Sequence, residues 1–278
     1  MQKELIKSPL NYTGGKYKLL PQILPLFPKD INTFVDLFCG GCNVAVNVKV
    51  KNIVCNDIEP HVIDFYRNVS QLTGEVAKDR ILEIVDKYSL SKTNQEGFLK
   101  CREDYNKNQT WDMFYALIAH AFNYEIRYNK RGEYNVAFGR NRSKFNPSLQ
   151  QKFVTFVDTI DNSFIFTNKD FTKMHINKLT SQDFVYCDPP YLITCANYNE
   201  QFGWNEEKER QLLELLDQLN KKGIKFALSN VLYHKGKTND ILIEWCKKYN
   251  VHNLNYTYSN CSYHGEKGSS DEVLICNY

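Results

Sequence analysis

The tetrapeptide Asp188-Pro189-Pro190-Tyr191 places a carboxylate, two prolines and an aromatic ring directly after the apolar run 183–187. In an open α/β sheet, ligands bind at the carboxyl ends of the strands, where such a turn would lie. The prolines hold the carbonyls of Asp188 and Pro189 in one direction. A carboxylate and a carbonyl can each accept one hydrogen of an NH₂ group while Tyr191 stacks on its ring. The motif therefore predicts a binding site for a planar amine, with Asp188 as catalytic acceptor, although a strand followed by a capped surface turn has the same residues.

Two further segments have the pattern of a nucleotide-binding unit. The apolar run 34–38 leads into the glycine pair 40–41, and the run 53–57 ends in an acid. Asp36 and Asp57 are separated by about the 20 residues expected between a nucleotide-binding turn and the acid that bonds a ribose. These segments predict the first βαβ unit of an α/β sheet, although a glycine turn alone is weak evidence.

The remaining strand candidates lie on both sides of a long polar region. Leucines at helical spacing between 212 and 219 predict an amphipathic helix that stops at Gly223. Residues 62–150 lack strand patterns and are predicted to be a helical insertion, so that 1–61 and 151–278 form one discontinuous catalytic domain. The further strand candidates are 164–167, 183–187, 225–229, 251–256 and 273–278.

The insertion carries a basic loop after a predicted helix at 111–122. From residue 127 to residue 144 there are six positive side chains and one negative, a local charge of +5, interleaved with Tyr128, Tyr134 and Phe138. The whole chain carries only +3, so a nucleic-acid partner must be bound by a local patch. Basic residues between aromatic ones suit phosphate contact and base stacking, although an ordinary solvated loop can have the same composition. We favour nucleic acid.

Cysteine usage indicates reduced thiols in the cytosol. The nine cysteines occur without a secretory leader and without an apolar span near the roughly 20 residues of a membrane helix. Cys39 and Cys42 have redox-motif spacing but lie in a glycine turn without a second pair, and Cys261 and His264 lack further ligands. No metal is expected, and His120 is interpreted as a helix residue rather than a ligand.

Several motifs, taken together and in order, resemble the Dam-type (alpha-group, D12 class) DNA adenine-N6 methyltransferases. The resemblance covers nearly the whole chain, and its motifs lie at 10–16, 34–41, 56–57, 127–139 and 188–191. It implies an S-adenosylmethionine-dependent methyltransferase fold, a Rossmann-like seven-stranded sheet with an inserted helical target-recognition domain. The implied activity is that of a site-specific adenine DNA-methyltransferase, EC 2.1.1.72.

In such an enzyme S-adenosylmethionine donates a methyl group to adenine N6 in duplex DNA. Since that amine is paired and stacked, the resemblance implies base flipping at a cost of about a few kcal/mol. It also implies a cytoplasmic, DNA-associated protein of bacterial or phage origin without a membrane partner. A cognate restriction endonuclease acting on the same site is a second candidate partner.

The resemblance assigns residues to three sites. The target base is held by Asp188, Pro189 and Tyr191. The cofactor is held by Tyr12, Thr13, Gly14, Gly15, Lys16, Asp36, Phe38, Gly40, Asp57, Asp170, Phe171 and Asp188. DNA is bound by Asn11, Phe122, Asn123, Glu125, Arg127, Asn129, Lys130, Arg131, Arg140 and Arg142.

Some of these assignments include a specific role. Asp57 would bond the ribose and Asp170 the adenine of the cofactor, while Phe122 and Asn123 occupy the position of a wedge. Arg127 matches an arginine that reads guanine, since its parallel donors suit O6 and N7. A phosphate contact is the alternative for Arg127.

Three departures limit the transfer. Cys42 replaces the second glycine of the family's Phe-x-Gly-x-Gly. Members that methylate GATC carry Lys-Trp where this chain has Asn11-Tyr12, and an apolar residue where it has Glu125. We therefore expect a guanine in the recognition site through Arg127, but we do not assign GATC.

Two other functions remain to be weighed. Methyltransferases acting on RNA or on protein amides generally begin the Pro-Pro motif with Asn, which Asp188 disfavours. A catalytically silent DNA-binding protein could keep the fold, but retention of both Asp57 and Asp188 argues against it.

Overall fold

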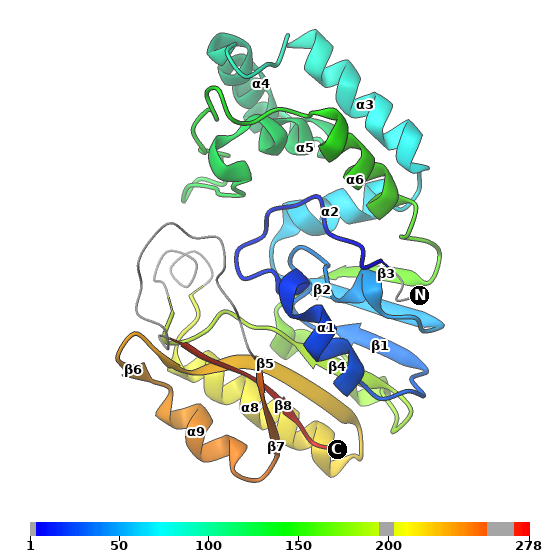
Figure 1. Cartoon of the computed structure of the whole chain (residues 1–278), viewed down its shortest axis with the longest axis vertical. Coiled ribbons are helices and arrows are strands. Elements are labelled where there is room, and N and C mark those ends of the chain that lie inside the picture. Colours follow the sequence, from blue (N-terminus) through cyan, green and yellow to red (C-terminus); the bar gives the residue numbers. More distant parts are fainter. Residues whose placement is uncertain (1–3, 195–202, 255–269) are drawn as a thin grey trace. The chain divides into compact units, whose positions relative to one another are not determined.

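The protein, described from a computed structural model over residues 4–194, 203–254 and 270–278, has the expected α/β fold. Its sheet has the strand order β3-β2-β1-β4-β5-β8-β7 (Figure 1), and β6 pairs with β5 at its end. The strands β1, β2, β4 and β5 run parallel, while β8 is antiparallel to both β5 and β7. The bounds are β1 Thr33–Asp36, β2 Asn52–Asp57, β3 Phe164–Asn168, β4 Phe184–Cys187, β5 Lys225–His234, β6 Lys237–Thr238, β7 Asn250–Leu254 and β8 Ser270–Cys276.

Along the chain, most of the helices lie between β2 and β3, and two more lie on either side of β5. Their bounds are α1 Leu20–Ile23, α2 Pro60–Val69, α3 Gly74–Lys87, α4 Gln95–Lys107, α5 Trp111–His120, α6 Pro147–Val157, α8 Glu206–Lys221 and α9 Asp240–Cys246. Short 3-10 helices are η1 Lys16–Leu19, η2 Leu24–Leu26, η3 Ala45–Asn47, η4 Phe122–Tyr124, η5 Phe171–Lys173 and η6 Ile176–Lys178.

The chain divides into two compact units. The first, which we call the helical unit, comprises Met1–Gly15, Gly40–Asn47 and Glu59–Phe166. The second, the sheet unit, comprises Lys16–Cys39, Val48–Ile58 and Thr167–Tyr278. The N-terminal segment joins the helical unit because the backbone N–H groups of Ile6 and Ser8 donate to the side chains of Asn47 and Asn43. These two units are defined by their internal packing, and their bounds differ from those of the predicted insertion at 62–150. The role of that insertion in target recognition is a proposal.

The helical unit is organised around α5. Nine of its ten residues are buried, which is the burial of a central helix rather than of a surface one. Phe65 of α2 stacks on Tyr115 with ring centroids 5.5 Å apart, and Phe153 of α6 lies 4.7 Å from Tyr115. His120 is also buried, with its Nδ1 2.8 Å from the carbonyl of Ala116, as expected for a helix residue.

The sheet unit packs α8 against its parallel strands. The five leucines of α8 join Val185, Phe226 and Leu228 in one core, and the helix ends just before Gly223 as predicted. All four residues of β4 are buried, as in parallel strands covered on both faces. This burial places the end of β4, and therefore Asp188, at a fixed position.

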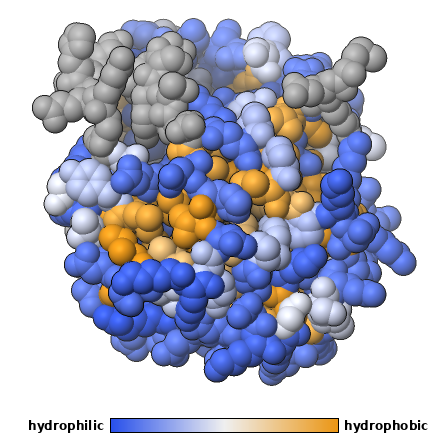
Figure 2. Space-filling model, turned by 60° about the horizontal axis from the view of Figure 1, so that its bottom comes forward, coloured by the Kyte–Doolittle hydropathy of each residue, from blue (hydrophilic) through white to orange (hydrophobic). Residues whose placement is uncertain are grey.

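The surface is mainly hydrophilic on the face drawn in Figure 2, with hydrophobic side chains exposed between polar ones. Among the described residues, no helix is both long enough and apolar enough to cross a membrane.

Candidate functional site

Asp188 follows β4 directly and lies in a cluster of charged groups around a buried lysine. Lys16 Nζ is 3.0 Å from Asp188 Oδ1 and 3.5 Å from Glu272 Oε1, with only 4% of the lysine side chain exposed. The Tyr191 hydroxyl donates to the same Asp188 oxygen at 3.0 Å, and Lys16 Nζ lies 4.9 Å from the centre of the Tyr191 ring. The structure therefore brings Lys16, from the N-terminal motif, into contact with the motif that contains Asp188 and Tyr191.

The electrostatics of this cluster set the charge of Asp188. Burial raises the pKa of its carboxyl group, Lys16 lowers it, and the negative charge of Glu272 raises it again; the result lies above the ordinary value. Burial lowers the pKa of Lys16, but Asp188 and Glu272 together outweigh that effect and raise it. An ammonium shared by two carboxylates is thus kept protonated.

Glu272 was missed by the sequence reasoning. It lies on β8, where it pairs with Val231 of β5 and Leu254 of β7, and its Oε1 is 3.2 Å from the Tyr191 hydroxyl. The signal was an acid just before the apolar run 273–276, but a charge at the start of a strand is ordinarily solvated. Only strand order shows that it reaches Asp188.

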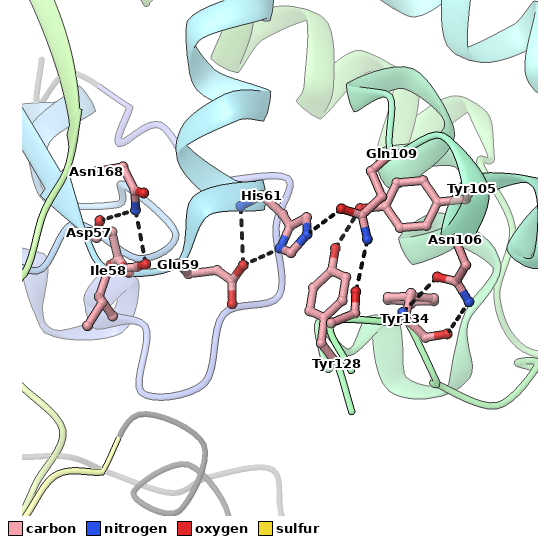
Figure 3. A network of polar contacts seen from close by, with 11 residues as sticks. Asp57, Ile58, Glu59, His61, Tyr105, Asn106, Gln109, Tyr128, Tyr134 and Asn168 are labelled. Atoms are coloured by element: carbon pink, nitrogen blue, oxygen red, sulfur yellow. Dashed lines mark hydrogen bonds and ion pairs between the residues drawn. The ribbon is translucent and has the colours of Figure 1, made fainter. Parts of the chain in front are cut away.

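The two predicted nucleotide-binding acids end adjacent parallel strands. Asp36 is the last residue of β1 and Asp57 the last of β2, and both are buried. The Asn168 side chain donates to the carbonyls of Asp57 and Ile58 at 2.9 Å, as Figure 3 shows. The Asn56 side chain donates to the carbonyls of Leu37 and Lys169. These asparagines, neither of them predicted as functional, fasten the ends of β1, β2 and β3 to one another.

Aromatic rings surround the turn that carries Asp170. Phe38 and Phe171 lie 5.4 Å apart, and Trp204 lies 5.7 Å from Phe38 and 5.6 Å from Phe171. Lys208 Nζ is 2.8 Å from Asp170 Oδ2. Burial raises the pKa of Asp170, but hydrogen bonds from Lys208 and Thr172 outweigh it, so that the pKa lies below its ordinary value.

Trp204 and Lys208 were not predicted. Lys208 lies in the first turn of α8 and Trp204 just before that helix, which the sequence reasoning interpreted only as leucine-rich and amphipathic. Their position beside Phe38, Phe171 and Asp170 follows from the packing of α8 on the sheet.

The glycine turn and the N-terminal segment meet within the helical unit. A Cβ on Gly40, whose φ is +43°, would lie 2.7 Å from a ring atom of Tyr12, so only glycine fits there. Gly14 has a φ of +79° and nothing within 4 Å of where its Cβ would be. Thr13 is exposed beside it, and the Gly15 N–H donates to the Tyr12 carbonyl. These features leave backbone accessible to a ligand, as a nucleotide-like cofactor requires.

Cys42 stands where the family's motif has its second glycine. It is fully buried and has a φ of +60°, a left-handed conformation that glycine adopts readily and a residue with a Cβ does not. Cys42 therefore keeps the backbone shape of the usual glycine at some cost in strain.

The predicted wedge lies on a strained turn. Phe122 is 41% exposed and is followed by Asn123 and Tyr124, both in the left-handed region with φ of +53° and +56°. The Asn11 side chain donates to the Asn123 carbonyl at 2.8 Å. The structure thus unites two predicted DNA-binding residues 112 positions apart, and strain in consecutive non-glycine residues is typical of functional turns.

Arg127 is held loosely. Half of its side chain is exposed, Nε donates to Asn135 Oδ1 at 3.1 Å, and Nη1 lies 4.0 Å from Glu125 Oε2. Asn129 has an internal use, since its Oδ1 accepts from the backbone N–H groups of Arg131 and Glu133. Lys130, Arg131, Arg140 and Arg142 are exposed, and Arg140 also donates to Gln95.

The chain matches one known protein family over most of its length. Residues 12–260 match the D12 class N6 adenine-specific DNA methyltransferases. The chain belongs to this family. Membership confirms the resemblance inferred from the motifs, and the family implies a methyl donor.

The chain is similar both to relatives more than twice its length and to a relative of about its own length. It is 47% identical to the type II methyltransferase M.FokI of Planomicrobium okeanokoites and 46% identical to the modification methylase StsI of Streptococcus sanguinis. These matches cover 98% and 99% of this chain but only 43% of either relative, so the chain spans less than half their length. The DNA adenine methylase of Escherichia coli strain K12 is 28% identical, with 95% of this chain and 93% of that protein covered.

Proposed function

We propose that this protein is a site-specific adenine DNA-methyltransferase, EC 2.1.1.72, which transfers a methyl group from S-adenosylmethionine to adenine N6 in duplex DNA. The observation that carries the proposal is the Asp188 cluster at the carboxyl end of β4, in a chain of this family. A partly buried carboxylate with one oxygen bound by Lys16 and Tyr191 is a fixed acceptor for an exocyclic amine.

The proposed chemistry depends on which oxygen of Asp188 is already in contact with other residues. Both of its contacts among the described residues use Oδ1, which leaves Oδ2 to accept one hydrogen of the amine. The Pro189 carbonyl accepts the other, and the lone pair is then concentrated on N6. When bound, S-adenosylmethionine would supply a methyl group already activated on a sulfonium, with a neutral thioether as the leaving group. Asp188 Oδ2 would lie where it can take the proton that N6 loses. The chain chiefly supplies alignment and exclusion of water.

The residues assigned to the cofactor fit that group. In the sheet unit, Asp57 would bond the ribose and Asp170 the adenine amine, with Phe38, Phe171 and Trp204 around the ring. In the helical unit, the accessible backbone at Gly14 would approach the ligand beside Tyr12.

We further propose that Phe122 fills the space left by a flipped adenine and that Arg127 reads a guanine. Support comes from the exposed ring of Phe122 beside a strained turn and from the Arg127 guanidinium, which makes only weak contacts within the protein. A cognate restriction endonuclease is the proposed partner because the relatives M.FokI and StsI are named a type II methyltransferase and a modification methylase. The recognition sequence stays open beyond the guanine.

Substitution of Asp188 tests the proposed function. Asp188→Ala is expected to lower methyl transfer to duplex DNA by at least about 100-fold, because the amine loses its acceptor. Transfer of labelled methyl from S-adenosylmethionine gives the rate, and long-read sequencing of the product gives base, strand and site. DNA binding and thermal unfolding should change little, and Asp30→Ala, an exposed acid of the same unit, is the control. Full activity of Asp188→Ala would overturn the mechanism, and preferential methylation of RNA would overturn the substrate.

A further inference from the structure

A set of contacts within the helical unit runs from the start of α2 to the loop that carries Arg127 (Figure 3). Glu59 is buried and caps α2 by accepting the His61 backbone N–H. The same carboxylate oxygen contacts His61 Nδ1, while His61 Nε2 is 3.1 Å from Gln109 Oε1. Gln109 Nε2 then donates to the carbonyl of Gly132, in the loop, at 2.9 Å.

The two contacts hold the His61 ring at both of its nitrogens. Nδ1 lies against the Glu59 carboxylate and Nε2 against the Gln109 side-chain oxygen, so the ring has one orientation within this set of contacts.

The His61 ring lies flat on an aromatic ring of the loop. The rings of His61 and Tyr128 are 3.8 Å apart and inclined by only 11°. Tyr128 is fixed further by a 2.7 Å hydrogen bond between its hydroxyl and that of Tyr105, and by a β-bridge to Tyr134. The stack therefore holds the Tyr128 ring from a second side.

We propose that His61 is a positioning residue for target recognition, which acts through Tyr128 to hold the adjacent Arg127 where it can read a guanine. The inference rests on the proposed function of Arg127. The two neighbouring side chains differ in how firmly they are held. The Arg127 side chain is half exposed and, among the described residues, hydrogen-bonded only to Asn135. Tyr128 is held by both His61 and Tyr105. The position of Arg127 is thus set by its neighbour.

The experiment compares methylation of the recognised duplex with that of a duplex in which the guanine read by Arg127 is replaced. His61→Ala is expected to reduce the ratio of kcat/KM values by about 10-fold, within the range for one bidentate base contact, while kcat at saturating DNA stays within about threefold. His61→Phe, which keeps the stack but cannot contact Glu59 and Gln109 through ring nitrogens, should retain part of the discrimination. Tyr128→Leu should behave as His61→Ala does.

Controls separate this proposal from the proposed function. Arg127→Ala sets the scale for loss of guanine reading, and His252→Ala, on β7 of the sheet unit, should leave the ratio unchanged. An unchanged ratio in His61→Ala beside a collapsed ratio in Arg127→Ala would overturn the role of His61 alone. Equal losses of kcat on both duplexes would also overturn it. No methylation by the wild type would overturn the proposed function instead.

Discussion

At the scale of single residues, the acceptor Asp188 depends on a second carboxylate. The Tyr191 hydroxyl lies within 3.2 Å of oxygens of both Asp188 and Glu272, but it can donate to only one of them at a time. Lys16 is shared in the same way. Glu272 therefore tunes how readily Asp188 holds a negative charge, without contacting the target amine in our proposal.

Glu272→Gln is expected to move the acid limb of the pH–rate profile toward lower pH. Asp188 must be ionised to accept the amine hydrogen, so activity is lost as pH falls below its pKa. Glu272 raises that pKa, and removal of its charge lowers it. Single-turnover rates between about pH 5 and pH 8 measure the shift. Asp271→Asn, at the exposed neighbouring position, is the control, and a limb that stays in place or moves upward would contradict the coupling.

At the scale of elements, Glu209 ties α8 to the sheet. It is buried, and its carboxylate accepts hydrogen bonds from Trp204 and from the side chains of Asn230 on β5 and Asn239 before α9. Burial raises the pKa of Glu209, and the three donors oppose that effect. The same acid thus holds Trp204 beside Phe38 and Phe171.

Glu209→Ala is expected to lower the free energy of unfolding by about 3 kcal/mol or more, since each of several buried donors loses its partner at about 1–3 kcal/mol. Urea unfolding measures the change. Glu214→Ala, an exposed acid on the same helix, should change it by no more than about 0.5 kcal/mol. Equal stability of the two variants would show that water replaces the carboxylate and that Glu209 does not fasten α8.

The helices and strands were largely predictable, because apolar runs and helical periodicity in the sequence reflect which residues are buried. Strand β5 is longer than predicted: it continues to His234, paired with β8 and β6, because the polar Asn230 interrupts the apolar pattern without ending the strand. The predicted strand at 251–256 is described only to Leu254. Motif residues such as Asp188 were found because their spacing is local. Glu272, Trp204 and His61 were not, since their relevance depends on contacts between distant elements.

At the scale of the whole molecule, positive charge is concentrated in one loop. The chain has a net charge of +3, and residues 127–144 alone carry +5, so the remainder carries −2. Attraction to the DNA backbone is therefore expected from this loop rather than from the surface at large. The exposed guanidinium of Arg142 has no base-reading role in our proposal, which makes it a probe of phosphate contact.

Arg142→Gln is expected to weaken DNA binding about equally for all sequences. Each phosphate contact releases about one counterion, so the slope of log K against log salt should become shallower by about 0.9. Binding titrations at several salt concentrations, on recognised and unrelated duplexes, measure both quantities. Lys221→Gln removes one charge from the exposed end of α8 and should leave the slope unchanged. If both variants alter the slope equally, net charge rather than the loop governs the attraction, and if neither does, Arg142 contacts no phosphate.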